Sequence, residues 1–575
     1  MAPEVRRWLV VPGLAIAVAG AGGALAVRAT RSLPADIFYQ LFVEHDLAAA
    51  VLYAVSILAA AAVARRVAAE RVDRAVEALG AHPWPVVLAA VAGLSAAALT
   101  VYHNHPLALD EYSQYFQAEV FAAGQVFVEY PDELVFRLIP RQFVGPFFEA
   151  QTGRVISSYW PGFPLLLAPF VKAGIPWLLN PLLAGGSLLL LARIARRLLP
   201  GTAAPGWAVL FALASPQFTV NAISYYAMGA HLFLNLAFVA LLLTPSSLRL
   251  FLAGLAGSLA LVLHQPLPHA AFAIPWIVWL ALVRDAGAGR GGPGRLGRLF
   301  FLFLGYLPLG LLLGVGWYLL LWQIPLAPAD AAVGEASGRV ASGFLSRALT
   351  NLGIAGLPQL DVLSYRAIEY LKLFLWAVPG LPVLAALGAW RNRRVAGLRL
   401  LGWAAVSSLA AFFFVPFPQG HGWGYRYFHQ AWGAVPLLAA ALVVSAGRAR
   451  AAWTRVMGTL AVLSLVAGTA LRFIQVDGFI DRHLGQLPTL AEGRRQVCFL
   501  ATQWGYYRAD LVQNDPLLRD PVVILVSFGR QRDAELMRRM EPAARPIFDN
   551  GLDTVWLVEP GPETGDPAAP AVPPR

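Results

Sequence analysis

Apolar stretches of about twenty residues, the length that crosses the hydrocarbon core of a bilayer as a helix, recur along most of the chain. Short polar or arginine-bearing connections separate them. We expect thirteen membrane spans, at 8–27, 47–64, 84–102, 177–195, 204–219, 226–243, 248–265, 268–284, 299–320, 368–389, 399–417, 429–446 and 453–471. The pattern therefore predicts a polytopic α-helical membrane protein.

Arginines gather in the connections that follow the second, fourth, eighth, tenth and twelfth spans. This set comprises Arg65, Arg66, Arg71, Arg74, Arg193, Arg196, Arg197, Arg284, Arg290, Arg295, Arg298, Arg391, Arg393, Arg394, Arg399, Arg448, Arg450 and Arg455. With thirteen spans these connections share one side, which the positive-inside rule makes cytoplasmic. The long loop at 103–176 and everything after Arg472 are then predicted to face the periplasmic, extracytoplasmic side.

The long loop (103–176) opens with an acidic pair, Asp110 and Glu111, just beyond the third span. From Glu111 the spacing predicts an amphipathic helix with Tyr112, Phe116 and Val120 on one stripe. A carboxylate at the mouth of a membrane cavity can act as general base on an acceptor hydroxyl. The alternative is that Asp110 only caps the helix while Glu111 interacts with the helix dipole.

After the last span the charge density becomes ordinary. Short apolar runs, VCFLAT, PVVILVSF and DTVWLVEP, are separated by polar segments such as GRQRDAELMRRM, which is typical of a helix. This alternation predicts a small α/β domain at 473–560 on the extracytoplasmic side. The tail at 561–575, rich in Pro and Ala, is predicted to be disordered.

Composition narrows the class of protein and its partners. With 58% hydrophobic and 13% charged residues, the chain cannot be one soluble domain. The net charge of +11 suits anionic lipid rather than nucleic acid, because the arginines lie in short loops between spans. The single cysteine, Cys498, excludes an internal disulfide and a cysteine-based metal site. Basic residues are arginine except at Lys172 and Lys372, which is typical of a GC-rich bacterium.

Four segments carry a resemblance to a known family: DEYSQYFQAEVFAAGQ, TGRVISSYWPGFPLLLAPF, ASPQFTVNAISYYAMGAHLFLNLAFVALLL and HGWGYRYFHQAWGAVPLLAAAL. In order and spacing they resemble the GT-C superfamily of integral-membrane glycosyltransferases, in the bacterial branch related to protein O-mannosyltransferases and the lipid A aminoarabinose transferase. The resemblance implies a GT-C-like catalytic module at 84–472, with juxtamembrane helices in the long loop. It also implies a sugar donor on a polyprenyl phosphate and Asp110 as catalytic base, with Glu111 beside it. Residues 1–83, with two spans, are an addition to the family's pattern.

The donor phosphate requires cations near the acidic pair. Arg426 lies beside Tyr425 in the turn GHGWGYRY, whose glycines permit close approach of a ligand; an interfacial aromatic belt is the alternative. Further candidates for contact with phosphate or sugar are Arg137, Arg141, Lys172, His264 and Tyr159. His264 stands where many members of the resembled family carry arginine, so its charge is expected to depend on pH. Surface anchoring is the alternative for Arg137 and Arg141.

The spacing of the histidines does not predict a metal site. The histidines His103, His105, His264, His269, His421 and His429 match no zinc spacing, so no metal is assigned; a divalent metal is not indicated and no cofactor is required. Early in the tenth span, an internal ion pair or snorkelling explains Arg366, Glu369 and Lys372.

We therefore expect a membrane glycosyltransferase that moves a sugar, with inversion, from a polyprenyl-phosphate donor to an envelope glycan, lipid or protein. The main alternative is a polytopic transporter or lipid-linked-sugar flippase without covalent chemistry. A membrane scaffold with a decayed catalytic site is a third reading.

Overall fold

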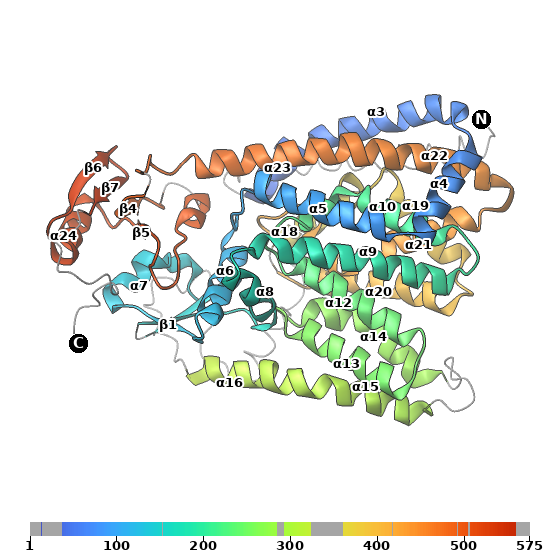
Figure 1. Cartoon of the computed structure of the whole chain (residues 1–575), viewed down its shortest axis with the longest axis horizontal. Coiled ribbons are helices and arrows are strands. Elements are labelled where there is room, and N and C mark those ends of the chain that lie inside the picture. Colours follow the sequence, from blue (N-terminus) through green and yellow to red (C-terminus); the bar gives the residue numbers. More distant parts are fainter. Residues whose placement is uncertain are drawn as a thin grey trace.

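The computed structural model describes residue 13 and residues 37–151, 153–283, 293–323, 360–416, 418–491, 493–503 and 506–558. Apart from residue 13, the predicted span at 8–27 lies outside these residues, as does the tail at 561–575. The described chain forms a helical bundle with a small sheet-containing part at one end (Figure 1).

Five described helices are long and apolar enough to cross a membrane: Phe42–Arg66, Pro176–Leu198, Arg295–Leu321, Ala396–Phe413 and Gly447–Leu484. A sixth arises if α4 (Ala69–Ala81) and α5 (Trp84–Thr100), bent by 83°, form one span. Shorter apolar helices accompany them: α8 (Gly162–Lys172), α10 (Ala204–Leu213), α12 (Met228–Leu242), α13 (Ser247–Leu261), α14 (Leu267–Leu282), α19 (Leu381–Arg391) and α21 (Ala434–Val444). Helices thus overlap the predicted spans from the second to the thirteenth.

Several long helices are assembled from consecutive shorter elements. These elements are α2 (Ile37–Leu41), η1 (Phe42–Asp46), α3 (Leu47–Val63), η2 (Ala64–Arg66), η4 (Pro176–Leu178), α9 (Leu179–Leu198), α15 (Arg295–Leu309), η5 (Gly310–Val315), α16 (Gly316–Gln323), η7 (Gly447–Ala449), α22 (Arg450–Leu463), η8 (Ser464–Gly468) and α23 (Thr469–Leu484). The remaining helices of the bundle are α11 (Pro216–Asn221), α18 (Leu360–Leu375), α20 (Ala396–Phe413) and η6 (Arg426–Ala431).

Two predicted boundaries are wrong. The tenth span, predicted as one helix over 368–389, is broken between α18 and α19, because Gly380 adopts a left-handed backbone with φ +81 at the N-cap of α19. The last helix does not stop at 471: α23 continues to Leu484. Residues 473–484 therefore extend the bundle rather than open the C-terminal domain.

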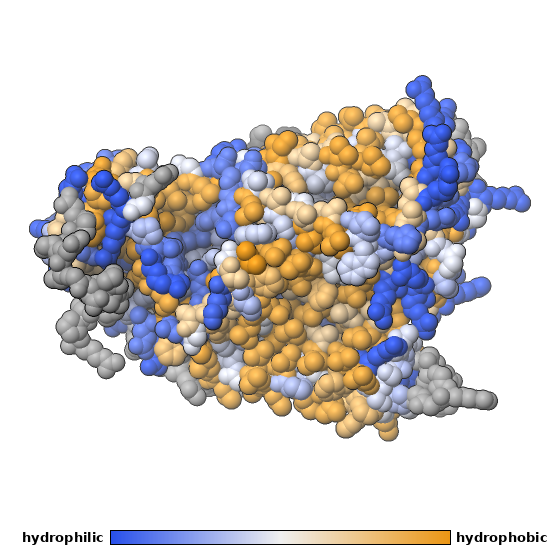
Figure 2. All heavy atoms as spheres, in the orientation of Figure 1, coloured by the Kyte–Doolittle hydropathy of each residue, from blue (hydrophilic) through white to orange (hydrophobic). Residues whose placement is uncertain are grey.

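The surface agrees with a membrane-embedded bundle. On the face seen in Figure 2, apolar residues cover the middle of the bundle and hydrophilic residues gather at its two ends. Helix α4, which carries the exposed Arg71, lies at the end of the bundle opposite to the long loop and the C-terminal sheet (Figure 1). The fold therefore separates the arginine-bearing connections from the acidic pair.

The long loop folds into its own compact layer. Its elements before α8 are α6 (Leu109–Ala122), β1 (Val128–Glu129), α7 (Asp132–Leu138), η3 (Arg141–Phe143), β2 (Phe148–Gln151) and β3 (Arg154–Ser157). The strands form an antiparallel sheet in the order β1-β3-β2. The stripe of Tyr112, Phe116 and Val120 on α6 is buried, and Phe116 meets Phe148 of β2 edge to face at 5.2 Å.

The C-terminal sheet has the order β5-β4-β7-β6, in which β4 and β5 are parallel and the other pairs antiparallel. Its elements are β4 (Gln496–Leu500), η9 (Tyr506–Leu511), β5 (Val522–Val526), α24 (Arg530–Met540), β6 (Arg545–Asp549) and β7 (Thr554–Leu557). Phe499, Leu525 and Met537 share one apolar core with residues of the long loop. The two layers therefore fold against each other.

A buried charge network ties the N-terminal helices to the rest of the bundle. The carboxylate of Asp46, in η1, accepts from Lys372 Nζ at 2.7 Å and from Trp376 Nε1 at 2.6 Å, and it lies 3.0 Å from Arg472 Nη1. Lys372 is only 2% exposed, so the expectation that it snorkels is wrong. Its partner is Asp46, whereas Glu369 pairs with Arg366.

Candidate functional site

The turn between α20 and η6 holds Arg426 in place through its glycines. Gly424 has φ +65, and a Cβ there would lie 2.0 Å from Oε1 of Gln217. Gln217, in α11, occupies that space and fastens the turn: its Oε1 accepts from Tyr425 N at 2.8 Å and its Nε2 donates to Tyr425 O at 3.1 Å. Glycine is therefore required where the turn approaches α11.

Arg426, at the start of η6, forms an ion pair with Asp110 of the long loop. Its other terminal nitrogen donates to Gln419 O, and the guanidinium lies over the ring of Tyr226, 4.3 Å from the ring centre. Arg426 is 7% exposed, so it is held in a largely water-free place with one anionic partner. The structure thus joins a predicted base to a predicted phosphate ligand.

Asp110 is not the helix cap that the alternative interpretation expected. Helix α6 begins at Leu109 with Ala108 as N-cap, so Asp110 lies inside the first turn. Its side chain is 13% exposed and points to Arg426. Its partner is therefore the Arg426 guanidinium and not the backbone at the start of α6.

Glu111 takes the capping role instead. It is fully buried; its carboxylate accepts from Leu107 N at 2.9 Å, Ala108 N at 3.3 Å and Tyr225 N at 2.8 Å, and from the Tyr102 hydroxyl at 3.0 Å. Burial, together with the Asp110 charge, raises the pKa of Glu111 to about 8, although these donors oppose the shift. With its oxygens enclosed by these donors, Glu111 holds the start of α6 against Tyr225, and its part in catalysis stays a prediction.

His264 and Tyr159 lie together, and Arg426 is near enough for its charge to act on His264. Their ring centres are 5.3 Å apart, and His264 Nδ1 lies 3.0 Å from Nε2 of His231 in α12. Burial, reinforced by the charge of Arg426, lowers the pKa of His264 to about 3. His264 is therefore neutral at physiological pH, which corrects the expectation of a pH-dependent charge.

Four other predicted ligands are placed differently. Arg137 is buried against the C-terminal sheet, where Nη1 lies 2.6 Å from Asp533 Oδ1. Arg141 is exposed, with its guanidinium 4.8 Å from the ring centre of Phe136, and Lys172 is exposed at the end of α8. Tyr425 is fully buried and packs against Tyr370 and Phe428. None of these four is brought to the acidic carboxylate in the described contacts.

Sequence reasoning missed Tyr226 and Gln419, which line Arg426, and Asp510, which reaches the start of α6. Asp510 Oδ1 accepts from Leu109 N at 3.3 Å, next to Asp110. Tyr226 falls within a segment that carries the family resemblance, but no local pattern points to it. Asp510 is 401 residues from Leu109 in the chain, so only the fold reveals it.

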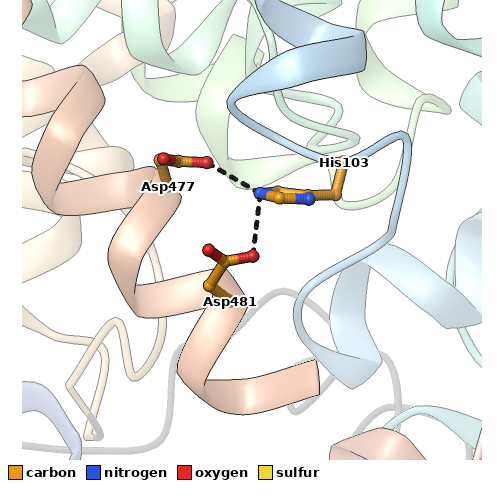
Figure 3. Close-up of side chains that lie close together, drawn as sticks. All are labelled: His103, Asp477 and Asp481. Carbon is orange, nitrogen blue, oxygen red and sulfur yellow. Dashed lines mark hydrogen bonds and ion pairs between the residues drawn. The ribbon is translucent and has the colours of Figure 1, made fainter. Parts of the chain in front are cut away.

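One group of described side chains can hold a metal ion: His103, before α6, with Asp477 and Asp481 on α23 (Figure 3). Nε2 of His103 lies 2.8 Å from Asp477 and 3.6 Å from Asp481. One imidazole with two carboxylates suits zinc or manganese. All three side chains are partly solvent-exposed, and an ion pair accounts for the same contacts.

Comparison of the sequence with protein-family models gives no match, and neither does comparison with curated proteins. Among solved structures, ArnT from Cupriavidus metallidurans is similar. The structure of ArnT bound to undecaprenyl phosphate is 15% identical in sequence to this chain, with a TM-score of 0.46. The match covers 84% of this chain and 99% of the ArnT chain. The structure of ArnT in the apo state is 14% identical, with a TM-score of 0.47, and the match covers 84% of this chain and 100% of the ArnT chain. The likeness is distant.

Proposed function

We propose that this protein is a membrane glycosyltransferase that moves a sugar from a polyprenyl phosphate to a hydroxyl on an extracytoplasmic acceptor. The observation that carries the proposal is the ion pair of Asp110 and Arg426 at one end of an apolar helical bundle. A base and a phosphate ligand are the two groups that such a transfer needs. The acceptor is an envelope glycan, lipid or protein.

The two residues act in succession. The donor phosphate binds the guanidinium of Arg426 and displaces the Asp110 carboxylate, because phosphate and carboxylate compete for the same planar donors. The freed carboxylate then takes the proton of the acceptor hydroxyl. Asp110 is thereby kept from acting as a base until the donor is bound.

The transfer step balances as a single displacement. The acceptor oxygen forms a bond to the anomeric carbon while the bond from that carbon to the phosphate oxygen breaks. The bonding electrons leave with the polyprenyl phosphate, whose added negative charge Arg426 stabilises, and the hydroxyl proton stays on Asp110. Attack opposite to the leaving group inverts the anomeric configuration.

The surroundings suit the two ends of the donor. Neutral His264 can donate a hydrogen bond, and the adjacent ring of Tyr159 offers a face for the sugar. An apolar pocket on α15 and η5 offers a lining for the prenyl chain; it is lined by Phe300, Phe303, Leu304, Tyr306, Leu307, Gly310, Leu311 and Val315. Trp317 on the following helix donates to Tyr159 O at 3.0 Å, which connects the helix of the pocket to the site.

The test is transfer from a panel of labelled polyprenyl-phosphate sugars in membranes that contain the wild-type chain or Asp110→Asn. We expect labelled product with the wild type and its loss, by roughly a hundredfold or more, in the variant. Asp132→Asn is the matched control, because Asp132 is an exposed acid of the same loop.

Three results would change the assignment. Transfer that survives Asp110→Asn removes Asp110 as base. Absence of transfer and of lipid-phosphate binding across the panel rejects the enzyme. Movement of lipid-linked sugar across the membrane without product favours the flippase or transporter alternative.

A further inference from the structure

The C-terminal domain places one carboxylate between the two chain segments that carry Asp110 and Arg426. Asp510, in η9, is 2% exposed. Its Oδ1 accepts from Leu109 N, the residue before Asp110, and its Oδ2 lies 3.0 Å from Nε2 of His421. His421 belongs to the glycine-rich turn that ends at Arg426. The Asp510 side chain thus contacts both of the chain segments that carry the ion pair, at Leu109 and at His421.

His421 is itself held by aromatic rings. Its imidazole stacks on Tyr507, also in η9, at 4.8 Å between ring centres, and meets Phe479 of α23 at 6.2 Å. It is 6% exposed. The ring therefore has little freedom to turn away from Asp510.

Neighbouring contacts fix the register between the C-terminal domain and α6. The Tyr112 hydroxyl donates to Asn514 O at 2.7 Å and accepts from Asn514 N at 2.8 Å. Gln513 Nε2 donates to Pro106 O at 2.7 Å. Residues 510–514 are thus aligned with the start of α6 on both sides of Asp110.

We propose that Asp510 and His421 are positioning residues that hold Asp110 and Arg426 in register, so that the C-terminal domain is part of the active site. The domain does not merely cover the long loop: it sets the separation between base and phosphate ligand. This inference rests on the proposed transferase, in which a misplacement of about 1 Å between reacting groups costs on the order of a hundredfold in rate.

Two variants of Asp510 separate its contacts. Asp510→Asn retains an oxygen for Leu109 N but replaces the carboxylate oxygen opposite His421 by an amide nitrogen, and Asp510→Ala removes both oxygens. We expect kcat to fall roughly tenfold in the first and roughly a hundredfold in the second. The KM for the polyprenyl-phosphate sugar should change by less than about threefold, because Arg426 itself is retained.

Asp533→Asn is the matched control. Asp533 joins the same domain to the long loop through Arg137. Arg137 lies in α7 and not at the start of α6. Its loss should lower the melting temperature while kcat of the folded protein stays within about twofold. If Asp533→Asn lowers kcat as Asp510→Ala does, the effect is domain docking alone and the positioning role is rejected.

A second measurement needs no turnover. Hydrogen–deuterium exchange of the full chain in detergent should become faster in peptides covering 105–112 and 418–426 when Asp510 is alanine, and stay unchanged there in Asp533→Asn. Unchanged exchange in Asp510→Ala overturns the inference. If Asp110→Asn retains transfer, the proposed function fails, while the exchange experiment still decides whether Asp510 holds the two segments.

Discussion

Arg426 pairs with Asp110 across 316 residues of chain, so the base and the phosphate ligand proposed for this site are each other's charged partner. In the proposed transfer, this relationship makes the donor phosphate a competitor of the Asp110 carboxylate. It also links the two substrates, because a base that is released only by the donor cannot activate the acceptor first.

Asp110→Asn should therefore bind polyprenyl phosphate more tightly than the wild type, by roughly tenfold, even as it loses transfer. The amide leaves the Arg426 guanidinium without its anionic partner, and the phosphate no longer has to displace a carboxylate. Titration of purified protein with the lipid phosphate measures the Kd.

Arg426→Gln provides the complementary measurement. We expect it to weaken lipid-phosphate binding by at least roughly tenfold. Equal or weaker binding in Asp110→Asn, relative to the wild type, would contradict competition between phosphate and carboxylate.

Glu111 should make stability depend on pH. Its pKa is raised from 4.5 to about 8, so the native state holds this proton more tightly than the unfolded chain does. The stabilisation is complete below pH 4.5 and is lost as the pH rises to about 8. The melting temperature of the wild type minus that of Glu111→Gln should therefore shrink between pH 5 and pH 8.

Glu111→Ala tests the capping role separately. It leaves the buried N–H groups of Leu107 and Tyr225 without an acceptor, at a cost of about 1–3 kcal/mol each. A wild-type advantage over Glu111→Gln that is constant with pH would mean that the surrounding donors keep Glu111 ionised throughout.

Lys372→Met should destabilise the protein by about 3–5 kcal/mol, because it removes one of two cations from the buried Asp46 carboxylate. Thermal unfolding in detergent measures the change. The chain's other lysine supplies the control: Lys172→Met, at an exposed position, should change stability by less than about 0.5 kcal/mol. Equal melting temperatures for the two variants would contradict a stabilising role of the ion pair between Lys372 and Asp46.

Gly424→Ala should be more harmful than Gly420→Ala. Both glycines have positive φ, +65 and +61, so both substitutions carry a backbone cost of about 1–2 kcal/mol. Only at Gly424 does a Cβ meet another group, Gln217 Oε1 at 2.0 Å; nothing lies within 4 Å of one at Gly420. The difference between the two variants in melting temperature and transfer therefore isolates the fit of the turn against α11. Similar losses in both would assign the whole effect to backbone strain.

Local pattern determined much of this protein. The apolar runs located the helices because a membrane span needs a fixed length of apolar residues, and the spacing of Tyr112, Phe116 and Val120 identified the buried face of α6. The alternation of short apolar runs with a polar helix likewise corresponds to strands and a helix after α23. Each of these features depends on neighbours within a few turns of chain.

Only the tertiary structure decided the partners of the charged residues. Asp110 was predicted as the base, with a helix cap as the alternative; the fold places Arg426 against Asp110 and gives the cap to Glu111, which also accepts from Tyr225 N. Lys372 found Asp46 at 326 residues' separation, and Arg137 found Asp533 at 396. The partner of a charged residue cannot be predicted from a sequence periodicity, because it can lie anywhere along the chain. Its role is set by which elements the packing of the whole bundle brings within a few ångströms, and how far water is excluded there.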